Sequence, residues 1–242
     1  MIDWQQRFRN QLKWTRELRD YLYNKINLHT KVNLLEIGCG HGELLKEIGE
    51  NYDLDLYGIE IDAERITAAE QTLQGRKIKA NLIHKDFLRN NFDDQMFEVI
   101  VTNYVFLWIQ DLKKAFKEIH RILKKNGILL IFSEPDYGGF IEYPNTNFKN
   151  ALISNLIKLG ADPEVGRKLN QYFDRYFAVI EKFCTSSPWI ANTNELDLLN
   201  EVEFFKKLLK DEDWDSKMMK FCIERKNYFI FIPTFSYYLR KV

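Results

Sequence analysis

The residues with the clearest chemical potential are three glycines at alternate positions after a buried stretch. Gly38, Gly40 and Gly42 follow the apolar run 32–37, and a helix-forming run, 43–48, comes directly after them. This order predicts a buried strand, a tight turn and a helix start. Glycines let a backbone approach a ligand closely, and the free amides at a helix N-terminus favour a polar or anionic group. The stretch therefore predicts a site for a nucleotide-like ligand.

The spacing of these glycines narrows the kind of ligand. A dinucleotide fingerprint places its third glycine three positions after the second, whereas Gly42 comes two after Gly40 and an acid, Glu36, stands two before Gly38. The pattern E-x-G-x-G-x-G resembles motif I of the class I S-adenosylmethionine-dependent methyltransferases, in particular their small-molecule "methyltransferase type 11" group. The resemblance implies that Gly38, Cys39 and Gly40 make room for the methionine and ribose moieties of S-adenosylmethionine, and that Glu36 orients its ammonium. S-adenosylhomocysteine would be the product.

Two later strand ends carry further polar residues. Glu60 ends the next predicted strand, roughly 20 residues beyond the glycine turn, where a carboxylate can accept hydrogen bonds from both ribose hydroxyls. The resemblance implies that Ile61 packs against the adenine. It also implies that Asp86 accepts from the adenine amino group and that the backbone amide of Phe87 donates to the ring. The alternatives are a solvated acid at Glu60 and an ordinary turn residue at Asp86.

Asn103 opens the loop after the fourth predicted strand. The resemblance implies that this loop meets the methionine end of the cofactor and faces the acceptor, so Asn103 is expected to bind the cofactor. Enzymes that methylate amino groups of DNA or glutamine have (D/N)-P-P-Y here, and Tyr104-Val105 lacks those prolines, so this acceptor chemistry loses support. Tyr104 and Trp108, with Trp14 from the N-terminal helix, are expected to form an aromatic wall that binds the substrate.

The candidates for catalysis lie in the loop after the fifth predicted strand, again at the edge where open α/β sheets bind ligands. Methyl transfer from a sulfonium is an in-line displacement, so the protein mainly aligns the donor and the acceptor and excludes water. A base is needed only if the nucleophile must lose a proton. Glu134, Asp136 and Tyr137 are the candidates for holding or deprotonating the acceptor. The alternative is that their loop only connects two elements.

The resemblance implies an α/β fold with a doubly wound, seven-stranded, mostly parallel sheet, helices on both faces and an antiparallel last strand. The predicted strands are 32–37, 54–60, 77–83, 97–102, 128–132, 179–185 and 227–239, and the predicted helices between them include 3–27, 43–50, 63–74 and 111–125. Pro233 inside the last strand demands a bulge or a break in the ladder.

One compact domain is expected, in three parts. Residues 1–30 would form an N-terminal helical lid and residues 31–143 the cofactor-binding core. Residues 144–242 would complete the sheet, with helical insertions at 144–177 and 190–225 that cover the pocket.

Composition restricts the class of partner. The 242 residues carry 35 basic and 35 acidic side chains and have a pI of about 6.9, and 45% are hydrophobic. A neutral chain does not suit a polyanion-binding surface, so a small molecule is the expected partner rather than nucleic acid. Three widely spaced cysteines predict neither a disulfide framework nor a metal site. With no secretory or membrane-spanning run in the sequence, we expect a cytoplasmic protein.

The sequence thus predicts a methyltransferase (EC 2.1.1.-) that acts on an unidentified small molecule. Two alternatives stay open. The first is a non-catalytic module of the same fold that binds the cofactor or a protein. The second is an NAD-dependent oxidoreductase, which should carry G-x-G-x-x-G. The atom that is methylated (N, O, S or C), the need for a base and the oligomeric state are left open.

Overall fold

A seven-stranded sheet forms the centre of the chain. The computed structural model describes residues 4–28, 32–184, 186, 188–210 and 212–242. The strand order is β3-β2-β1-β4-β5-β10-β7, in which β1 to β5 run parallel and β10 is antiparallel to both of its neighbours. The predicted doubly wound sheet with an antiparallel last strand is therefore confirmed. The strands are β1 (Asn33–Ile37), β2 (Asp55–Glu60), β3 (Ala80–His84), β4 (Phe97–Thr102), β5 (Leu123–Pro135), β7 (Phe177–Cys184) and β10 (Thr234–Lys241).

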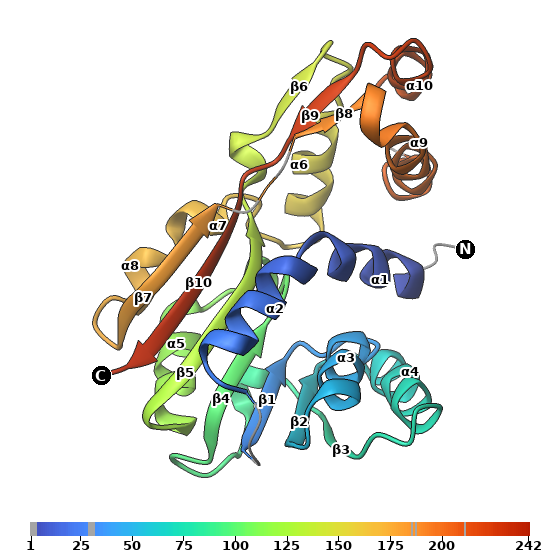
Figure 1. Ribbon diagram of the computed structural model, residues 1–242. Coiled ribbons are helices and arrows are strands. Elements are labelled where there is room, and N and C mark those ends of the chain that lie inside the picture. The colour runs from blue at the N-terminus through green and yellow to red at the C-terminus, as the bar shows by residue number, and fades with distance from the viewer. Residues whose placement is uncertain (1–3, 29–31, 185, 187, 211) are drawn as a thin grey trace.

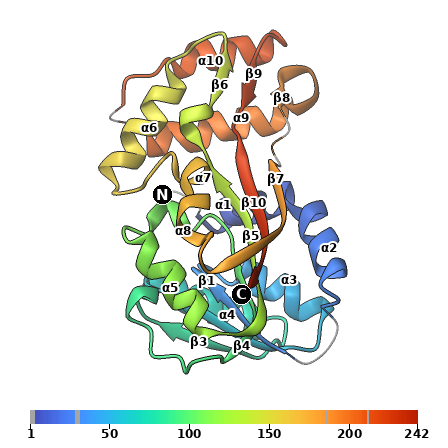
Figure 2. The ribbon, with the colours of Figure 1, turned by 90° about the vertical axis from the view of Figure 1, so that its left-hand side faces the viewer.

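Helices cover both faces of this sheet (Figures 1 and 2). One face is covered by α2 (Arg16–Lys25), α3 (Glu43–Asn51) and α4 (Ala63–Gln74), and the other by α5 (Leu112–Ile122), α7 (Val165–Lys168) and α8 (Asn170–Phe173). Side chains alternate between the faces, so that Leu34 packs in the α3 cluster while Leu35 packs in the α5 cluster. This two-sided burial explains why the central strands are nearly continuous apolar runs.

Local signals set the helix starts more reliably than the helix ends. Asp62 caps α4 by accepting from the amides of Glu64 and Arg65, and Asp111 caps α5 through the Lys114 amide. The helix predicted to run from 111 to 125 ends at Ile122, because Leu123 is fully buried and begins β5 opposite Phe97. In the second half of the predicted helical insertion 144–177, the helical residues form only the single-turn helices α7 and α8.

The N-terminal helix predicted over 3–27 is two helices, α1 (Trp4–Trp14) and α2, which separate at Thr15. The buried guanidinium of Arg19 donates from Nη1 to the Leu12 carbonyl and to Thr15 Oγ1. Its other nitrogens, Nε and Nη2, bind Glu47 of α3. These bonds stabilise the break, so α1 leaves the sheet and lies across its upper edge (Figure 1). Asp3 and Thr185, which two predicted elements included, lie outside the described residues.

A second, smaller layer lies beyond the carboxyl ends of the parallel strands (Figure 1). It contains the antiparallel sheet β6-β9-β8, which was not predicted, and three helices. Its elements, which we call the cap, are β6 (Ile141–Tyr143), α6 (Phe148–Lys158), β8 (Trp189–Ile190), α9 (Ala191–Leu208), α10 (Ser216–Glu224) and β9 (Phe229–Phe231).

The predicted strand 227–239 is divided between the two sheets at Pro233. Its first part, β9, pairs in the cap, and its second part, β10, pairs in the large sheet. Proline has no amide to donate, so the predicted break in the ladder is confirmed.

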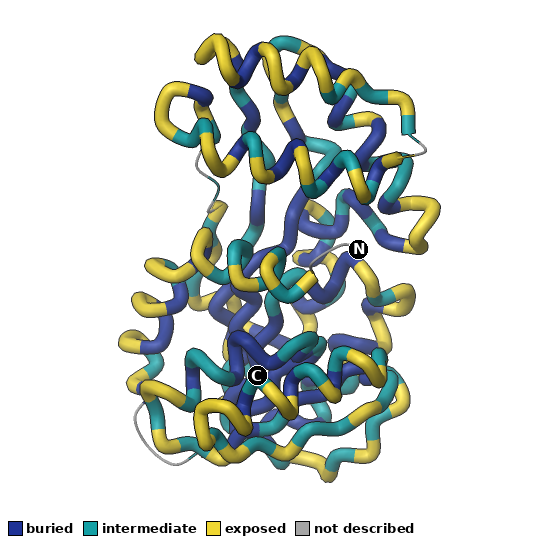
Figure 3. Tube along the Cα trace, turned by 90° about the vertical axis from the view of Figure 1, so that its right-hand side faces the viewer, coloured by how far each residue is buried: buried dark blue, intermediate teal, exposed yellow. Residues whose placement is uncertain are grey.

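One hydrophobic core runs from the α5 face of the sheet into the cap, where it includes Phe148, Val202 and Ile230. Figure 3 shows buried segments in both layers. No helix in the described ranges is long and apolar enough to cross a membrane.

Candidate functional site

The loop after β1 is shaped by its glycines. Gly38, Gly40 and Gly42 all have positive φ, between 50° and 75°, which side-chain-bearing residues rarely adopt. A Cβ on Gly38 would lie 2.6 Å from Cγ2 of Val105, so a larger residue would displace the loop that follows β4. The amides of Gly38 and Cys39 donate to the Ile59 carbonyl at 2.8 and 3.2 Å. The loop is therefore fixed between the ends of β2 and β4.

Glu60 turns its carboxylate toward this loop. The side chain is 6% exposed, and its Oε2 accepts from the Gly40 amide at 3.0 Å. Its Oε1 accepts from the amides of Ile61 and Asp62 at 2.9 and 3.1 Å. Ile61, beside it, is 66% exposed and thus leaves an apolar surface uncovered at the strand end.

Asp86 and Phe87 lie just past the neighbouring strand, β3. The Asp86 side chain accepts from the Leu88 amide at 2.9 Å, so it caps a single turn of 3₁₀ helix. The side chain of Phe87 is buried in the core beneath this turn. The structure thus brings both residues to the same sheet edge as Glu60.

The buried polar atoms that have no partner within the described residues include two acceptors at adjacent strand ends, Glu36 Oε2 on β1 and Asn103 Oδ1 after β4. An unpaired buried acceptor costs free energy, so each calls for a hydrogen-bond donor. Burial raises the pKa of Glu36, and the nearby Glu60 raises it further. An ammonium group would supply both the donors and the compensating charge, so these residues fit the amino-acid end of S-adenosylmethionine.

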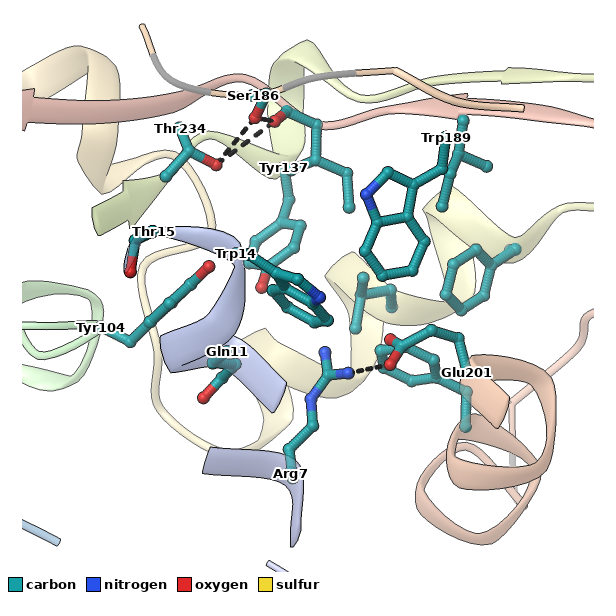
Figure 4. Close-up of a pocket in the computed structure, with 15 residues that line it drawn as sticks. Arg7, Gln11, Trp14, Thr15, Tyr104, Tyr137, Ser186, Trp189, Glu201 and Thr234 are labelled. Carbon is teal, nitrogen blue, oxygen red and sulfur yellow. Dashed lines mark hydrogen bonds and ion pairs between the residues drawn. The ribbon is translucent and has the colours of Figure 1, made fainter. Parts of the chain in front are cut away.

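A cavity of about 200 Å³ lies between α1, the loops at the sheet edge and the cap (Figure 4). Six aromatic side chains from all three regions contribute to its lining: Trp14, Tyr104, Tyr137, Phe148, Trp189 and Phe205. Two members of the predicted aromatic wall, Trp14 and Tyr104, thus face the cavity. Trp108 is 48% exposed and lies outside the lining.

Tyr104 connects this cavity to the glycine loop. Its backbone is left-handed, with φ of 57°, and its amide donates to the Ser133 carbonyl at 2.9 Å. The preceding residue is Asn103, with its unpaired oxygen, and the following residue is Val105, which packs on Gly38. The cavity therefore adjoins the place that Glu36 and Asn103 offer to a cofactor.

The three candidates for catalysis have different surroundings. Glu134 is fully buried, and its Oε1 accepts from the amides of Val105 and Phe106 at 2.8 and 3.0 Å. Burial raises its pKa to about 7. Asp136 is 4% exposed and accepts from Arg167 Nε at 2.7 Å. Neither Glu134 nor Asp136 belongs to the cavity lining.

Tyr137 is the member of this group that lines the cavity. Burial raises the pKa of its hydroxyl to about 12, against a smaller lowering by the positive charge of Arg7. The hydroxyl is therefore protonated at neutral pH and can donate a hydrogen bond to a bound molecule.

Sequence reasoning missed a charged pair in the cavity, Arg7 of α1 and Glu201 of α9. Arg7 Nη1 donates to Glu201 Oε1, and the two side chains are 10% and 11% exposed. The residues are 194 positions apart, so only the folded cap brings them together. The available signal was helical spacing, since Arg7, Gln11 and Trp14 stand four and three residues apart and share one face of α1.

Helix α1 also covers the glycine loop. The ring of Phe8 lies 5.1 Å from that of His41, and a Cβ on Gly40 would be 3.6 Å from Phe8. Arg9 Nε donates to Glu43 Oε1 at 2.7 Å, at the first turn of α3. The same helix thus contacts the glycine loop on one side and the cavity on the other.

Comparison with known proteins finds sequence similarity to methyltransferases. Residues 35–131 match the family described as "Methyltransferase domain". Phosphoethanolamine N-methyltransferase 3 of Arabidopsis thaliana is 29% identical over 137 residues, which cover 57% of this chain and 26% of that protein. Malonyl-[acyl-carrier protein] O-methyltransferase of Priestia megaterium is 25% identical over 206 residues, which cover 74% of each chain.

These matches concern the core of the chain more than its whole length. The first three curated relatives are matched over 26%, 32% and 37% of their own lengths, so the chain spans well under half of each. Among solved structures, the MccD protein superposes with a TM-score of 0.65 at 17% identity, over 92% of this chain and 95% of that one. At such identity the likeness establishes the fold, and an activity must be argued from the site.

Proposed function

We propose that this chain, which matches the methyltransferase-domain family over residues 35–131, is a class I S-adenosylmethionine-dependent methyltransferase that methylates a small molecule bound in the cavity. The observation that carries the proposal is the position of Tyr104. Its side chain lines the cavity, while the residues on either side of it reach the glycine loop and the unpaired acceptors. A donor held at the strand ends would then face an acceptor in the cavity.

The cofactor supplies an activated methyl group, and the chain supplies the residues that would hold it. Glu36 and Asn103 would accept hydrogen bonds from its ammonium. Glu60 would exchange its backbone partners for the ribose hydroxyls, a change between charge-assisted hydrogen bonds of similar strength. Ile61 would cover one face of the adenine.

Gly38, Cys39 and Gly40 would give close backbone approach to the cofactor. Asp86 and the amide of Phe87 would contact the edge of the adenine. The buried thiol of Cys39, whose pKa burial raises, would take no part in the chemistry.

The chain's own residues would promote transfer mainly by alignment and by exclusion of water. The aromatic lining would orient the acceptor, and the Tyr137 hydroxyl would hydrogen-bond it. Glu134 would act as a positioning residue, because its carboxylate holds the amides of the loop that follows β4. Asp136 would hold Arg167 and thereby the loop that carries Tyr137.

We also propose that the predicted N-terminal lid acts through α1. This helix contacts the glycine loop through Phe8 and Arg9 and the cavity through Trp14. None of the residues of α1 belongs to the buried core, so its opening would break surface contacts and leave the core packed. Both the cofactor and the acceptor would enter when α1 moves away.

The test is incubation of the full chain with methyl-labelled S-adenosylmethionine and a small-molecule extract, followed by separation of labelled products. We expect label in a low-molecular-weight product, and less of it with Tyr137→Phe. Tyr143→Phe, which alters a 65% exposed tyrosine of β6, is the matched control and should keep full activity. Label found only in protein or nucleic acid would contradict a small-molecule acceptor, and no transfer from any extract would contradict the enzyme.

A further inference from the structure

We propose that the acceptor is a small carboxylate with an apolar body, and that Arg7 is the residue that binds its carboxylate group. The assignment rests on the proposed function, since it names the substrate class of the same cavity. It is carried by the placement of Arg7, by the protonated hydroxyls of two tyrosines near it and by the aromatic faces that Arg7 already covers.

Arg7 is held in the cavity by contacts on two sides. Nη1 donates to Glu201, and the guanidinium carbon lies 4.9 Å from the ring centre of Trp14 and 4.8 Å from that of Phe204. Figure 4 shows the guanidinium between Trp14 and Glu201, reaching up from α1 toward Tyr137. Long side chains normally lose conformational freedom when they bind a ligand, and here that loss has already occurred on folding.

The guanidinium retains donors for a ligand. It carries five N–H groups in a planar fork, and Glu201 is its one hydrogen-bonding partner within the described part of the chain. Arg7 belongs to the cavity wall rather than to the closed core. Because the fork matches the two oxygens of a carboxylate, a carboxylate is the group that would use these donors best.

Two tyrosine hydroxyls near Arg7 also favour a negatively charged ligand. Tyr104 and Tyr137 both line the cavity, and the positive charge of Arg7 lowers the pKa of each, against the larger raising by burial. The positive potential of Arg7 therefore extends to both hydroxyls, and both keep a proton to donate. A bound oxygen anion would meet Arg7 and two neutral donors, and Arg7 already balances the negative charge of Glu201, which also lines the cavity.

A cationic acceptor is disfavoured by the same arrangement. Aromatic faces and a carboxylate could in principle hold an ammonium group. Arg7 already occupies the faces of Trp14 and Phe205 and already neutralises Glu201. A second cation would therefore have to compete with Arg7 for the same aromatic faces and the same carboxylate. The remaining apolar walls, which include Phe148 and Trp189, suit the uncharged body of the ligand.

The competing explanation is that Arg7 and Glu201 only join α1 to the cap. Such a clasp would give the cavity no preference between a carboxylate and an uncharged isostere, whereas a binding residue would. The two explanations therefore differ in a binding measurement that requires no turnover.

The experiment titrates the full chain with 3-phenylpropanoate, 3-phenylpropanamide and 3-phenylpropylammonium, which differ in the polar end alone. Tryptophan fluorescence, to which Trp14 and Trp189 of the cavity contribute, reports binding, and S-adenosylhomocysteine is present throughout. We expect the carboxylate to bind at least about tenfold more tightly than the amide, and the ammonium compound most weakly. Calorimetry of S-adenosylhomocysteine alone on the same sample tests the proposed function separately from this ranking.

Variants then assign the preference to Arg7. Arg7→Gln should reduce the carboxylate's affinity to that of the amide and leave the amide unchanged, while Arg7→Lys should give an intermediate value. Arg16→Gln removes the same charge from a side chain on α2 that is 71% exposed, and should change nothing. If Arg7→Gln does not fold, the ranking of the three probes on the unaltered chain decides.

Several results would overturn the assignment. They are equal affinity for carboxylate and amide, preference for the ammonium compound, no carboxylate binding at millimolar concentration, or an Arg7→Gln variant that keeps the preference. If any of these occurs while S-adenosylhomocysteine binds, the proposed function stands and the substrate class is wrong. If the cofactor product does not bind, the proposed function fails whatever the ranking.

Discussion

Replacing Glu134 by glutamine should stabilise the protein at alkaline pH while it impairs turnover. The carboxyl group is fully buried, and burial raises its pKa from the ordinary 4.5 to about 7. A raised carboxyl pKa means that the folded state binds the proton more tightly than the unfolded state. The native protein is therefore most stable below the unfolded pKa, and it loses stability as the pH rises from about 4.5 to about 7.

The size of the effect follows from these two values. The full difference corresponds to about 3 kcal/mol, and about 2.5 kcal/mol of it should appear between about pH 5 and about pH 8.5. The glutamine introduced by Glu134→Gln keeps an oxygen for the amides of Val105 and Phe106 but has no proton to lose. The variant's stability relative to the native chain should therefore rise with pH by about that amount.

The assay is urea denaturation followed by tryptophan fluorescence, for both proteins at both pH values. Other buried acids, such as Glu36 and Glu201, titrate equally in the two proteins and cancel in the difference. A difference in unfolding free energy that does not change with pH would refute the reasoning, since it would show that Glu134 titrates as an exposed acid. Greater stability of the variant together with lower turnover is expected when a residue that destabilises the fold is required by the site.

The other predictions concern the cofactor loop and the cavity. Glu60→Ala should weaken S-adenosylmethionine binding by about 1.5–3 kcal/mol, the scale of charged hydrogen bonds, and calorimetry showing affinity within a factor of two would remove Glu60 from the site. Tyr137→Phe should lower kcat by roughly threefold to tenfold, the contribution of one neutral hydrogen bond, and leave cofactor affinity unchanged. A loss in cofactor affinity larger than the loss in kcat would show that Tyr137 binds the cofactor instead. Gly42→Ala should destabilise the fold by about 1–3 kcal/mol, because φ is 75° and the new Cβ would lie 3.1 Å from that of Ala69; an unchanged urea midpoint would contradict this.

The sheet and the strand-end residues could be predicted because their signals are local. An apolar run followed by glycines at alternate positions specifies a strand and a turn, and the positive φ of Gly38 and Gly40 is the reason those glycines are needed. Once the strands are known to be parallel, Glu36, Glu60 and Asp86 must meet at one edge of the sheet. Their convergence therefore required no knowledge of distant contacts.

The cap and the cavity could not be predicted because they depend on distant contacts. The strands β6, β8 and β9 have three residues or fewer, too short to show a period of two. The break at Thr15 depends on Arg19 reaching Glu47 of another helix. In the same way, Arg7 became a candidate only when α9 placed Glu201 beside it.

For the loop that carries the catalytic candidates, the position could be predicted but the direction of each side chain could not. Its composition predicted a loop at the ligand-binding edge, and Tyr137 does line the cavity. Composition could not distinguish side chains that face the cavity from those that bind backbone amides of a neighbouring loop. Glu134 is of the second kind, because it accepts from amides of the loop after β4.

Calorimetric titration of the full chain with S-adenosylmethionine, S-adenosylhomocysteine and NAD in parallel tests the central claim most directly. The arrangement of Glu36, Glu60 and Asn103 around the glycine loop predicts micromolar binding of both adenosyl compounds and none of NAD. A folded chain that binds neither adenosyl compound, or that binds NAD instead, would contradict the account.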